Sequence, residues 1–344
     1  MVKQFSAKQH VIPASYIGNF SENIYTPTRK SVVLVKRDEK ELYSTQAENI
    51  GMKKNIYTIN SEGLGPKDYI DKTWEYVETN LPKAISLLAK HTDSYYFDAI
   101  IWSTVIVPFI SQLFIREMEY SVYLEERAPW LKDILEFDKS KLKDNSNINR
   151  LIDYQINCGL LVDAEWKLIH NSTNIPLITN DRGYGVFDAR HSGGPMGYII
   201  PINKKMLIMI AKKRLEIETT SVYGTKDTPE VVFPQGKIFD ERIVRGFNGS
   251  MASCARSEIY GAEEQVIMDA WSSRELKFKI NIGGPTLIQQ KHLSDMDMIT
   301  YFGEFLDLLP LSAEMRKGAF GGKEVYILEG KDGKKIKALG FKDL

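Results

Sequence analysis

The spacing of apolar residues predicts a block of helices in the middle of the chain. Residues 68–91 carry apolar side chains at helical spacing: Ile70, Trp74, Val77 and Leu81. Pro82 predicts a kink or a short break in this helix. Two further helices are expected over residues 94–127 and 138–161. The helical block therefore covers about residues 68–161.

Strand patterns lie on both sides of this block. Runs of β-branched or alternating apolar residues predict strands over residues 31–37, 165–170, 175–179, 198–202 and 206–210. Helical patterns return over residues 240–257 and 263–271, and a glycine-rich turn joins residues 325–328 to 336–339 as a hairpin. Strands at both ends with helices between them favour an α+β fold. We expect a mixed or antiparallel sheet, packed against the helical block, in which residues 32–36 pair with strands after residue 165.

Composition and charge exclude several classes of protein. The chain has 45 Lys plus Arg residues and 45 Asp plus Glu residues. No net charge therefore steers the whole chain to nucleic acid or to an anionic membrane, and the sequence leaves open whether the protein has a local basic patch. Cys158 and Cys254 stand alone, which argues against a disulfide framework or a thiolate zinc site. The uncharged run between Asp98 and Arg116 holds 17 residues and includes Pro108, so we interpret it as a kinked core helix rather than a membrane span. With no apolar segment after the amino terminus, the expected location is the cytoplasm.

Several short motifs occur in a fixed order between residues 8 and 262. The first is His10-Val-Ile-Pro13-Ala-Ser-Tyr16-Ile-Gly-Asn-Phe20, followed by the strand near residue 32, Val77-Glu78, and a helix that ends in Arg116. Trp166, Asn180-Asp181 at the end of an apolar strand, Ile199–Ile202, Asn248, Ala255-Arg256 and Tyr260 follow. In this order the motifs resemble the family known as domain of unknown function 4238. The resemblance implies one α+β domain over residues 1–262 and an extension, residues 263–344, that contains the terminal hairpin.

The chain departs from the pattern of this family at several positions. Gln9 stands where the family often has a second histidine, and Ala14 stands where glutamine is usual. The family's Ser-Asp-x-Pro motif is Asn180-Asp181-Arg182-Gly183 here, without the proline, and Glu117-Met118 replaces Thr-Pro. A divergent member can keep the fold and change or lose an activity. Because the function of the family is not settled, the resemblance supplies candidate residues and no mechanism.

His10 and Asp181 are the candidate catalytic residues. The His-x-x-Pro start is similar to that of HNH endonucleases, in which a histidine acts as a base beside a metal ion. The zinc-knuckle cysteines are missing, however, and the next histidine is His91. Asp181 ends an apolar strand at a glycine-containing loop, where a carboxylate can act as a base or bind Mg²⁺ or Mn²⁺. The alternatives are that His10 caps a helix or bonds a carboxylate, and that Asp181 bonds its own turn.

Five further polar residues are candidates for substrate binding. They are Glu78, Arg116, Asn180, Asn248 and Arg256. The planar fork of an arginine grips phosphate or carboxylate well, and Asn248 and Arg256 lie about two helical turns apart. The structural alternatives are a buried Arg116–Glu78 ion pair and capping or surface roles for the others.

Two functions of different classes fit these residues. The first is a hydrolase or transferase that acts on a phosphate-bearing substrate, such as nucleic acid or a nucleotide, with bacterial defence as its expected context. It predicts that His10, Asp181, Arg116 and Arg256 converge in one pocket. The second is a non-catalytic module that binds a ligand or a protein, and it predicts that His10 and Asp181 are satisfied by structural hydrogen bonds. The sequence leaves the oligomeric state open.

Overall fold

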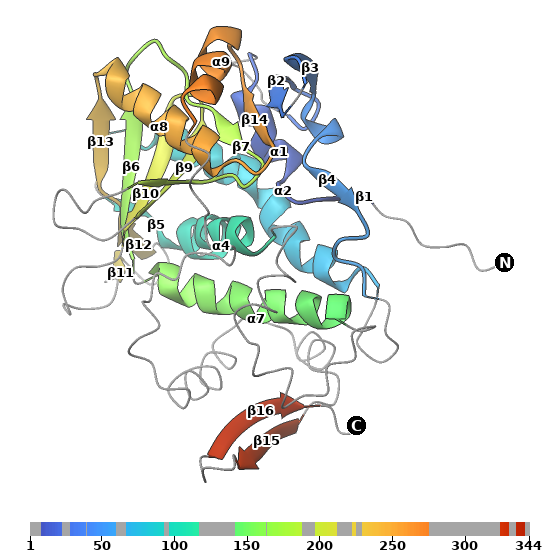
Figure 1. The fold of residues 1–344 in the computed structure, drawn as a ribbon. Coiled ribbons are helices and arrows are strands. Elements are labelled where there is room, and N and C mark those ends of the chain that lie inside the picture. The colour runs from blue at the N-terminus through green and yellow to red at the C-terminus, as the bar shows by residue number, and fades with distance from the viewer. Residues whose placement is uncertain are drawn as a thin grey trace.

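The helices and strands of the protein are set out in a computed structural model (Figure 1). It describes residues 8–22, 28–38, 40–59, 67–92, 96–116, 142–162, 164–187, 197–211, 222–224, 229–274, 324–329 and 335–340. The helices are α1 (Ala14–Ile17), α2 (Tyr69–Lys90), α3 (Ala99–Ile101), a π-helical turn (Trp102–Ile106), α4 (Val107–Ile115), α7 (Leu142–Val162), α8 (Glu241–Cys254) and α9 (Glu264–Ser272). Short 3₁₀ turns cover Gly18–Phe20 and Ala47–Asn49.

The strands form two larger sheets and three small ones. The first large sheet has the order β13 (Gln235–Ile238), β6 (Glu165–Asn171), β10 (Met206–Ala211), β9 (Gly197–Asn203) and β8 (Gly185–Phe187). The second has the order β3 (Tyr43–Gln46), β2 (Val32–Arg37), β14 (Glu258–Gly261) and β7 (Thr179–Asn180). The small sheets join β1 (Lys8–His10) to β4 (Met52–Lys54), β11 (Val222–Gly224) to β12 (Pro229–Val232) and β5 (Tyr96–Asp98), and β15 (Glu324–Glu329) to β16 (Lys335–Gly340).

The α+β fold class and the predicted pairing are both confirmed. Strand β2 pairs antiparallel with β14, so the amino-terminal strand joins strands that follow residue 165. All pairs in the first large sheet are antiparallel except β13 with β6, which makes this sheet mixed. The terminal hairpin also forms, with β15 antiparallel to β16.

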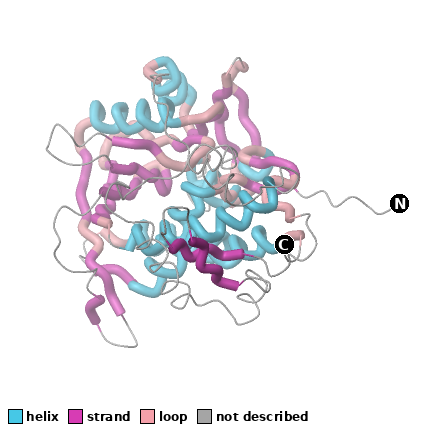
Figure 2. Tube along the Cα trace, turned by 60° about the horizontal axis from the view of Figure 1, so that its bottom comes forward, coloured by secondary structure: helices cyan, strands magenta, loops and turns pink. Residues whose placement is uncertain are grey.

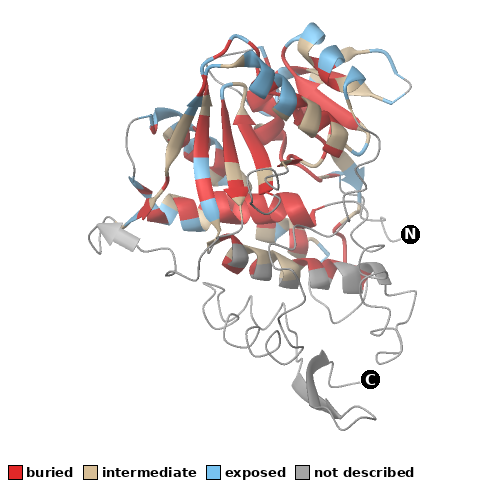
Figure 3. Ribbon diagram, turned by 60° about the vertical axis from the view of Figure 1, so that its left-hand side comes forward, coloured by how far each residue is buried: buried red, intermediate tan, exposed pale blue. Residues whose placement is uncertain are grey.

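The first large sheet lies between two groups of helices. Because side chains alternate along a strand, Ile208 and Ile200 point into a core shared with α2 and α4, whereas Leu207 and Ile199 point into a second core shared with α8 and α9. Figure 2 shows the strands between the two helix groups, and Figure 3 shows buried residues concentrated in the central strands and the helices they meet. The sequence predicts the first helical layer, but the packing of α8 and α9 on the opposite face appears only in the structure.

Helix α2 runs through Pro82 without the predicted break. A proline inside a helix costs about 3 kcal/mol, whereas burying one large apolar side chain contributes roughly 1.5–3 kcal/mol. The buried stripe of α2 continues beyond the proline at Ala84, Ile85 and Leu88. The burial of this stripe therefore outweighs the hydrogen bond that Pro82 cannot make.

The next predicted helix begins later than residue 94. Tyr96–Asp98 form β5, and the Asp98 carboxylate then accepts hydrogen bonds from the N–H groups of Ile100 and Ile101, which caps α3. The π-helical turn that follows lies directly before Val107 and Pro108, and α4 is buried along its whole length, as expected of a core helix. Residues 117–127 of the predicted helix lie outside the described residues.

The predicted strand over residues 175–179 is almost absent, and only Thr179–Asn180 pair in a sheet. The Asn248 side chain of α8 replaces a neighbouring strand: its Oδ1 accepts from the N–H of Ile178, and its Nδ2 donates to the carbonyl of Pro176. These two buried backbone groups are thus satisfied by a side-chain amide instead of a ladder of strand hydrogen bonds.

Helix α9 lies beyond residue 262, in the segment expected to be an extension. It packs against α8 and β14, and its Ile267 and Ala270 belong to the second core. Among the helices in the described parts of the chain, none is long and apolar enough to cross a membrane.

Candidate functional site

Three residues from distant motifs meet beside the middle of α2. His10 lies in β1, Glu78 on α2, and Arg116 directly after α4. The Arg116 Nη1 atom lies 2.5 Å from Glu78 Oε1, and Nη2 donates to the backbone carbonyl of His10. The fold therefore brings together residues that are up to 106 positions apart in the sequence.

These residues line a pocket of about 520 Å³, here called the His10 pocket. One wall consists of Asp71, Lys72, Glu75, Glu78 and Thr79 on α2 and of Asp68, which directly precedes this helix. The remaining wall consists of Lys8, Gln9, His10, Ala14, Ser15, Arg29 and Arg116. The pocket is thus lined by carboxylates from one helix and by cations that come mainly from other segments.

Arg116 is a buried cation, and both of its terminal nitrogens form hydrogen bonds. Its side chain is 2% exposed and lies over the rings of Tyr57 and Trp74, 5.5 and 5.6 Å from their centroids. Burial acts to lower the pKa of Arg116, but Glu78 and Tyr57 outweigh it, so the guanidinium stays charged. Both terminal nitrogens are occupied by Glu78, Gln112 and the His10 carbonyl, whereas Nε has no acceptor among the described residues. Arg116 mainly fixes β1 against α2, as in the structural alternative of a buried ion pair.

His10 has one ring nitrogen committed and one uncommitted. The ring bonds the backbone carbonyl of Glu48, and since Nε2 is buried without a hydrogen-bond partner among the described residues, this bond is made at Nδ1. Burial lowers the pKa of His10 below its ordinary value, Glu78 acts to raise it, and Arg116 acts to lower it. At neutral pH the imidazole is therefore uncharged, with the proton on Nδ1 and a lone pair on Nε2.

Gln9 joins the amino-terminal strand to the acidic wall. Its Nε2 donates to Asp71 Oδ2, and its Oε1 accepts from the N–H of Tyr57 at 2.8 Å. Burial raises the pKa of the Asp71 carboxyl, with the Gln9 hydrogen bond acting in the opposite direction. A glutamine at this position, where the family often has histidine, thus keeps a hydrogen-bonding side chain next to His10.

Asp181 lies in a different cluster. Its Oδ1 accepts from the N–H of Arg256 at 2.8 Å, and its Oδ2 accepts from the N–H and Oγ of Ser257 and the N–H of Glu258 at 2.8, 3.0 and 3.2 Å. The residue is 8% exposed, and burial raises its pKa against the effect of these hydrogen bonds. The carboxylate therefore fixes the backbone between α8 and β14.

The other predicted substrate-binding residues belong to this second cluster. Asn180 forms the turn that was expected of Asp181: its Oδ1 accepts from the N–H groups of Arg182 and Gly183, and Gly183 adopts a φ of 78°. Its Nδ2 donates to the carbonyls of Tyr184 and Met251. Asn248 holds the backbone of residues 176–178, and the side chain of Arg256 is exposed.

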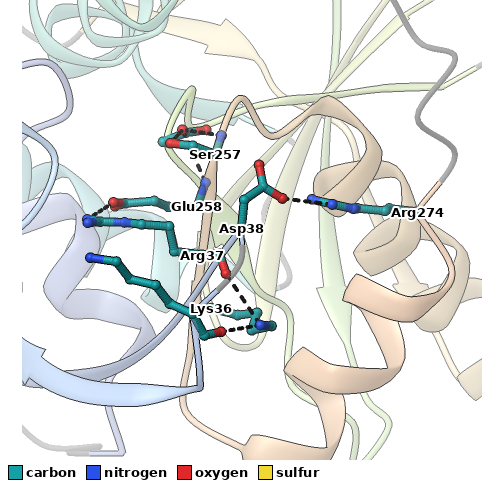
Figure 4. A network of polar contacts seen from close by, with 8 residues as sticks. Lys36, Arg37, Asp38, Ser257, Glu258 and Arg274 are labelled. Atoms are coloured by element: carbon teal, nitrogen blue, oxygen red, sulfur yellow. Dashed lines mark hydrogen bonds and ion pairs between the residues drawn. The ribbon is translucent and has the colours of Figure 1, made fainter.

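The cluster continues across the sheet as a network of polar contacts (Figure 4). Glu258 forms an ion pair with Arg37 of β2 and accepts a hydrogen bond from the Tyr260 hydroxyl at 2.7 Å. Asp38 forms an ion pair with Arg274 at 2.7 Å, just after α9 (Figure 4). These contacts tie β2 to β14 and to the end of α9, which is a structural role.

The expectation that His10, Asp181, Arg116 and Arg256 converge in one pocket is wrong. The structure unites His10, Glu78 and Arg116, and it places Asp181 and Arg256 with Asn180 and Asn248. The physical reason is that the Asp181 carboxylate is used by backbone N–H groups that would otherwise be buried without acceptors. The prediction that Asp181 holds a metal ion receives no support from this geometry. No group of three or more His, Cys, Asp or Glu side chains in the described residues is arranged to hold a metal ion.

Sequence reasoning missed the acidic wall of the pocket. Asp68, Asp71, Glu75 and Glu78 follow one another at spacings of three, four and three residues. This spacing places them on one face of α2, beside the apolar stripe. The stripe of carboxylates was visible in the sequence, but its opposition to β1 depends on the tertiary fold.

Comparison with known proteins gives a family and no closer relative. No curated protein and no solved structure matches the chain. The family model described as protein of unknown function DUF4238 matches residues 8–265, which include the residues of the His10 pocket, Asp181 with its hydrogen-bond partners, and all of α2, α4 and the two large sheets. The chain therefore belongs to the DUF4238 family.

Proposed function

We propose that the protein is a hydrolase or transferase that acts on a phosphate-bearing substrate, such as a nucleotide or nucleic acid, in the His10 pocket. The observation that carries this proposal is the uncharged imidazole of His10, whose Nε2 lacks a partner among the described residues. A buried polar atom without a partner is costly, so a substrate group that donates a hydrogen bond to Nε2 gains that energy. A positioned imidazole is also the commonest general base.

The surroundings of His10 fit proton transfer. The Glu48 carbonyl fixes the tautomer, so that Nε2 is the atom that accepts a proton from water or from a substrate hydroxyl. Glu78 favours the charged imidazolium and would stabilise it as it forms. Lys8, Arg29 and Lys72 are exposed cations that line the pocket, and Lys8, which has no ion-pair partner among the described residues, supplies positive charge for a phosphate group. A Mg²⁺ or Mn²⁺ ion that enters with the phosphate needs only one or two carboxylates from the protein.

The second candidate function is a non-catalytic module that binds a ligand or a protein. The observation that favours it is Asp181, because the carboxylate at the centre of the family motif is satisfied by four structural hydrogen bonds. In such a module the His10 pocket would bind its ligand without changing it. The two candidates therefore differ in turnover and not in the place of binding.

A turnover screen separates these two functions. The substrates are single- and double-stranded DNA, RNA, nucleotides and NAD, each with magnesium, manganese or chelator. His10→Asn removes the base but keeps an amide N–H for the Glu48 carbonyl, and His170→Gln is the matched control, since His170 bonds Gln235 on the first large sheet. We expect His10→Asn to reduce turnover by about 10²-fold or more and His170→Gln to leave it unchanged.

The pH dependence gives a second readout of the same base. Because the pKa of His10 is lowered, the base stays uncharged at pH values at which an ordinary histidine is already protonated. We expect the acidic limb of kcat/KM to lie below about pH 6.5. Full turnover in His10→Asn, or no turnover of any substrate by the wild type, would remove the enzyme proposal and favour the binding module.

A further inference from the structure

Most charges that line the His10 pocket are already neutralised within the protein. Lys72 forms an ion pair with Asp68 at 3.2 Å, Arg116 with Glu78 at 2.5 Å, and Arg29 with Glu48 at 3.1 Å. Each of these cations has a carboxylate partner before any ligand arrives. The charges that remain available to a ligand are therefore those of the residues outside these pairs.

Two carboxylates and one ammonium group remain. In the described part of the chain, the side chains of Glu75 and Lys8 form neither an ion pair nor a hydrogen bond. Asp71 is bonded by the neutral amide of Gln9, so its charge has no direct cationic partner. Burial raises the pKa of Asp71, and the hydrogen bond from Gln9 and the nearby charge of Arg116 only partly oppose this effect.

Asp71 and Glu75 are well placed to act together. They are four residues apart on α2, so they lie on one face of the helix with about 5–6 Å between their Cβ atoms. A cationic nitrogen group fits between two carboxylates at this separation, where each oxygen can accept one of its hydrogen bonds. Lys8 comes from β1, which forms a different wall of the pocket.

We propose that the ligand of the His10 pocket is a phosphate that also carries a cationic nitrogen group, with this group held by Asp71 and Glu75 and the phosphate held by Lys8. This inference rests on the proposed function for the place of binding, and it narrows the substrate class. The charge of Arg116 is paired with Glu78, but Arg116 lines the pocket, is 2% exposed, and has an Nε donor without an acceptor among the described residues, so it offers the phosphate one further hydrogen bond.

The remaining charges also argue against a plain polyanion. A ligand with several negative charges and no positive one would face Asp71 and Glu75 with only Lys8 in compensation. Like charges in a partly buried site repel each other, and this repulsion is only partly screened by salt. Among phosphate-bearing compounds, an ammonium, guanidinium or pyridinium phosphate is therefore favoured over an ordinary nucleotide.

Calorimetric titration with two small probes tests this inference. Phosphoethanolamine and ethyl phosphate share the phosphate and the two-carbon chain, and they differ in the ammonium group. We expect wild type to bind phosphoethanolamine about tenfold more tightly or better, the effect of a charged hydrogen bond. Glu75→Gln should abolish this preference without weakening the binding of ethyl phosphate, whose phosphate no longer faces the Glu75 carboxylate. Glu264→Gln, which changes an exposed carboxylate on α9, is the matched control and should keep the preference.

Each outcome decides the matter. Loss of the preference in Glu75→Gln alone supports the inference, and because Glu75 is exposed, its substitution should leave the thermal midpoint unchanged. Equal affinity for both probes, a preference that survives Glu75→Gln, or no binding of either probe overturns it. The enzyme proposal fails separately, through the turnover of His10→Asn, because a cation preference can exist in a pocket that only binds.

Discussion

At the scale of single residues, Asp181 and His10 show that position in a motif does not decide a role. Asp181 stands at the centre of the family motif, yet its carboxylate oxygens accept hydrogen bonds from residues 256–258. His10 lines a pocket, and its Nε2 atom has no hydrogen-bond partner among the described residues. The distinction depends on which hydrogen-bond donors the fold brings to each side chain, and no local pattern contains that information.

The structural role of Asp181 predicts a loss of stability in Asp181→Asn. The new amide N–H₂ would face N–H donors in a buried site, and hydrogen bonds to a charged acceptor are lost. We expect the free energy of unfolding in urea to fall by about 2–4 kcal/mol. Asp98→Asn is the control, because Asp98 is exposed and asparagine caps a helix nearly as well as aspartate. A variant as stable as wild type would contradict the structural role.

At the scale of elements, α8 takes the place of a strand. The segment of residues 175–178 is apolar and has the pattern of a strand, but two of its backbone groups, the N–H of Ile178 and the carbonyl of Pro176, are satisfied by the Asn248 amide. Strand patterns in a sequence report burial on a pleated surface and not the identity of the hydrogen-bond partner. The same limit explains Pro82, where burial of the α2 stripe overrides a local signal for a break.

Asn248→Ala tests whether the amide holds this segment. The substitution leaves the N–H of Ile178 and the carbonyl of Pro176 buried without their partner. We expect a loss of about 2–4 kcal/mol in the free energy of unfolding. Gln265→Ala on α9, which breaks only an exposed bond to Asp269, should change stability by less than about 0.5 kcal/mol. Equal losses of stability in the two variants would show that the buried Asn248 amide stabilises the fold no more than an exposed side-chain hydrogen bond does.

At the scale of the whole molecule, two cores lie on opposite faces of one sheet. The second core extends past residue 262, since Ile267 and Ala270 of α9 are buried in it. The family match ends at residue 265, within α9. The part of the chain that folds together with the family domain therefore includes this helix.

Ile267→Ala measures how strongly α9 contributes to the fold. Ile267 is 0% exposed, and replacing a buried isoleucine by alanine removes transfer energy and leaves a cavity. We expect the free energy of unfolding to fall by about 2–5 kcal/mol. Met268→Ala, one residue later and 36% exposed, should cost less than about 1 kcal/mol. If Ile267→Ala is as mild as Met268→Ala, α9 is a peripheral addition and not part of the core.

The sequence by itself determined the α+β class, most of the elements and the family. These follow from periodicity and short-range spacing, as in the stripe of α2 and the alternation of β10, because local geometry repeats every 3.6 or two residues. Through its motifs it also supplied His10, Glu78 and Arg116 of the pocket and Asn180, Asp181, Asn248 and Arg256 of the second cluster. What it could not supply was the separation of those residues into two clusters.

Only the tertiary structure decided which polar groups are satisfied. Glu78, Arg116 and His10 meet because α2, α4 and β1 pack together, and Asp181 is enclosed because α8 ends beside the turn after β7. Lys8, Asp71 and Glu75 became candidates only in the structure. It shows that the other charged side chains of the pocket form ion pairs, and that these three form none among the described residues. Hydrogen bonds and ion pairs between residues far apart in the chain depend on the path of the backbone through space, and that path is set by the burial of both cores.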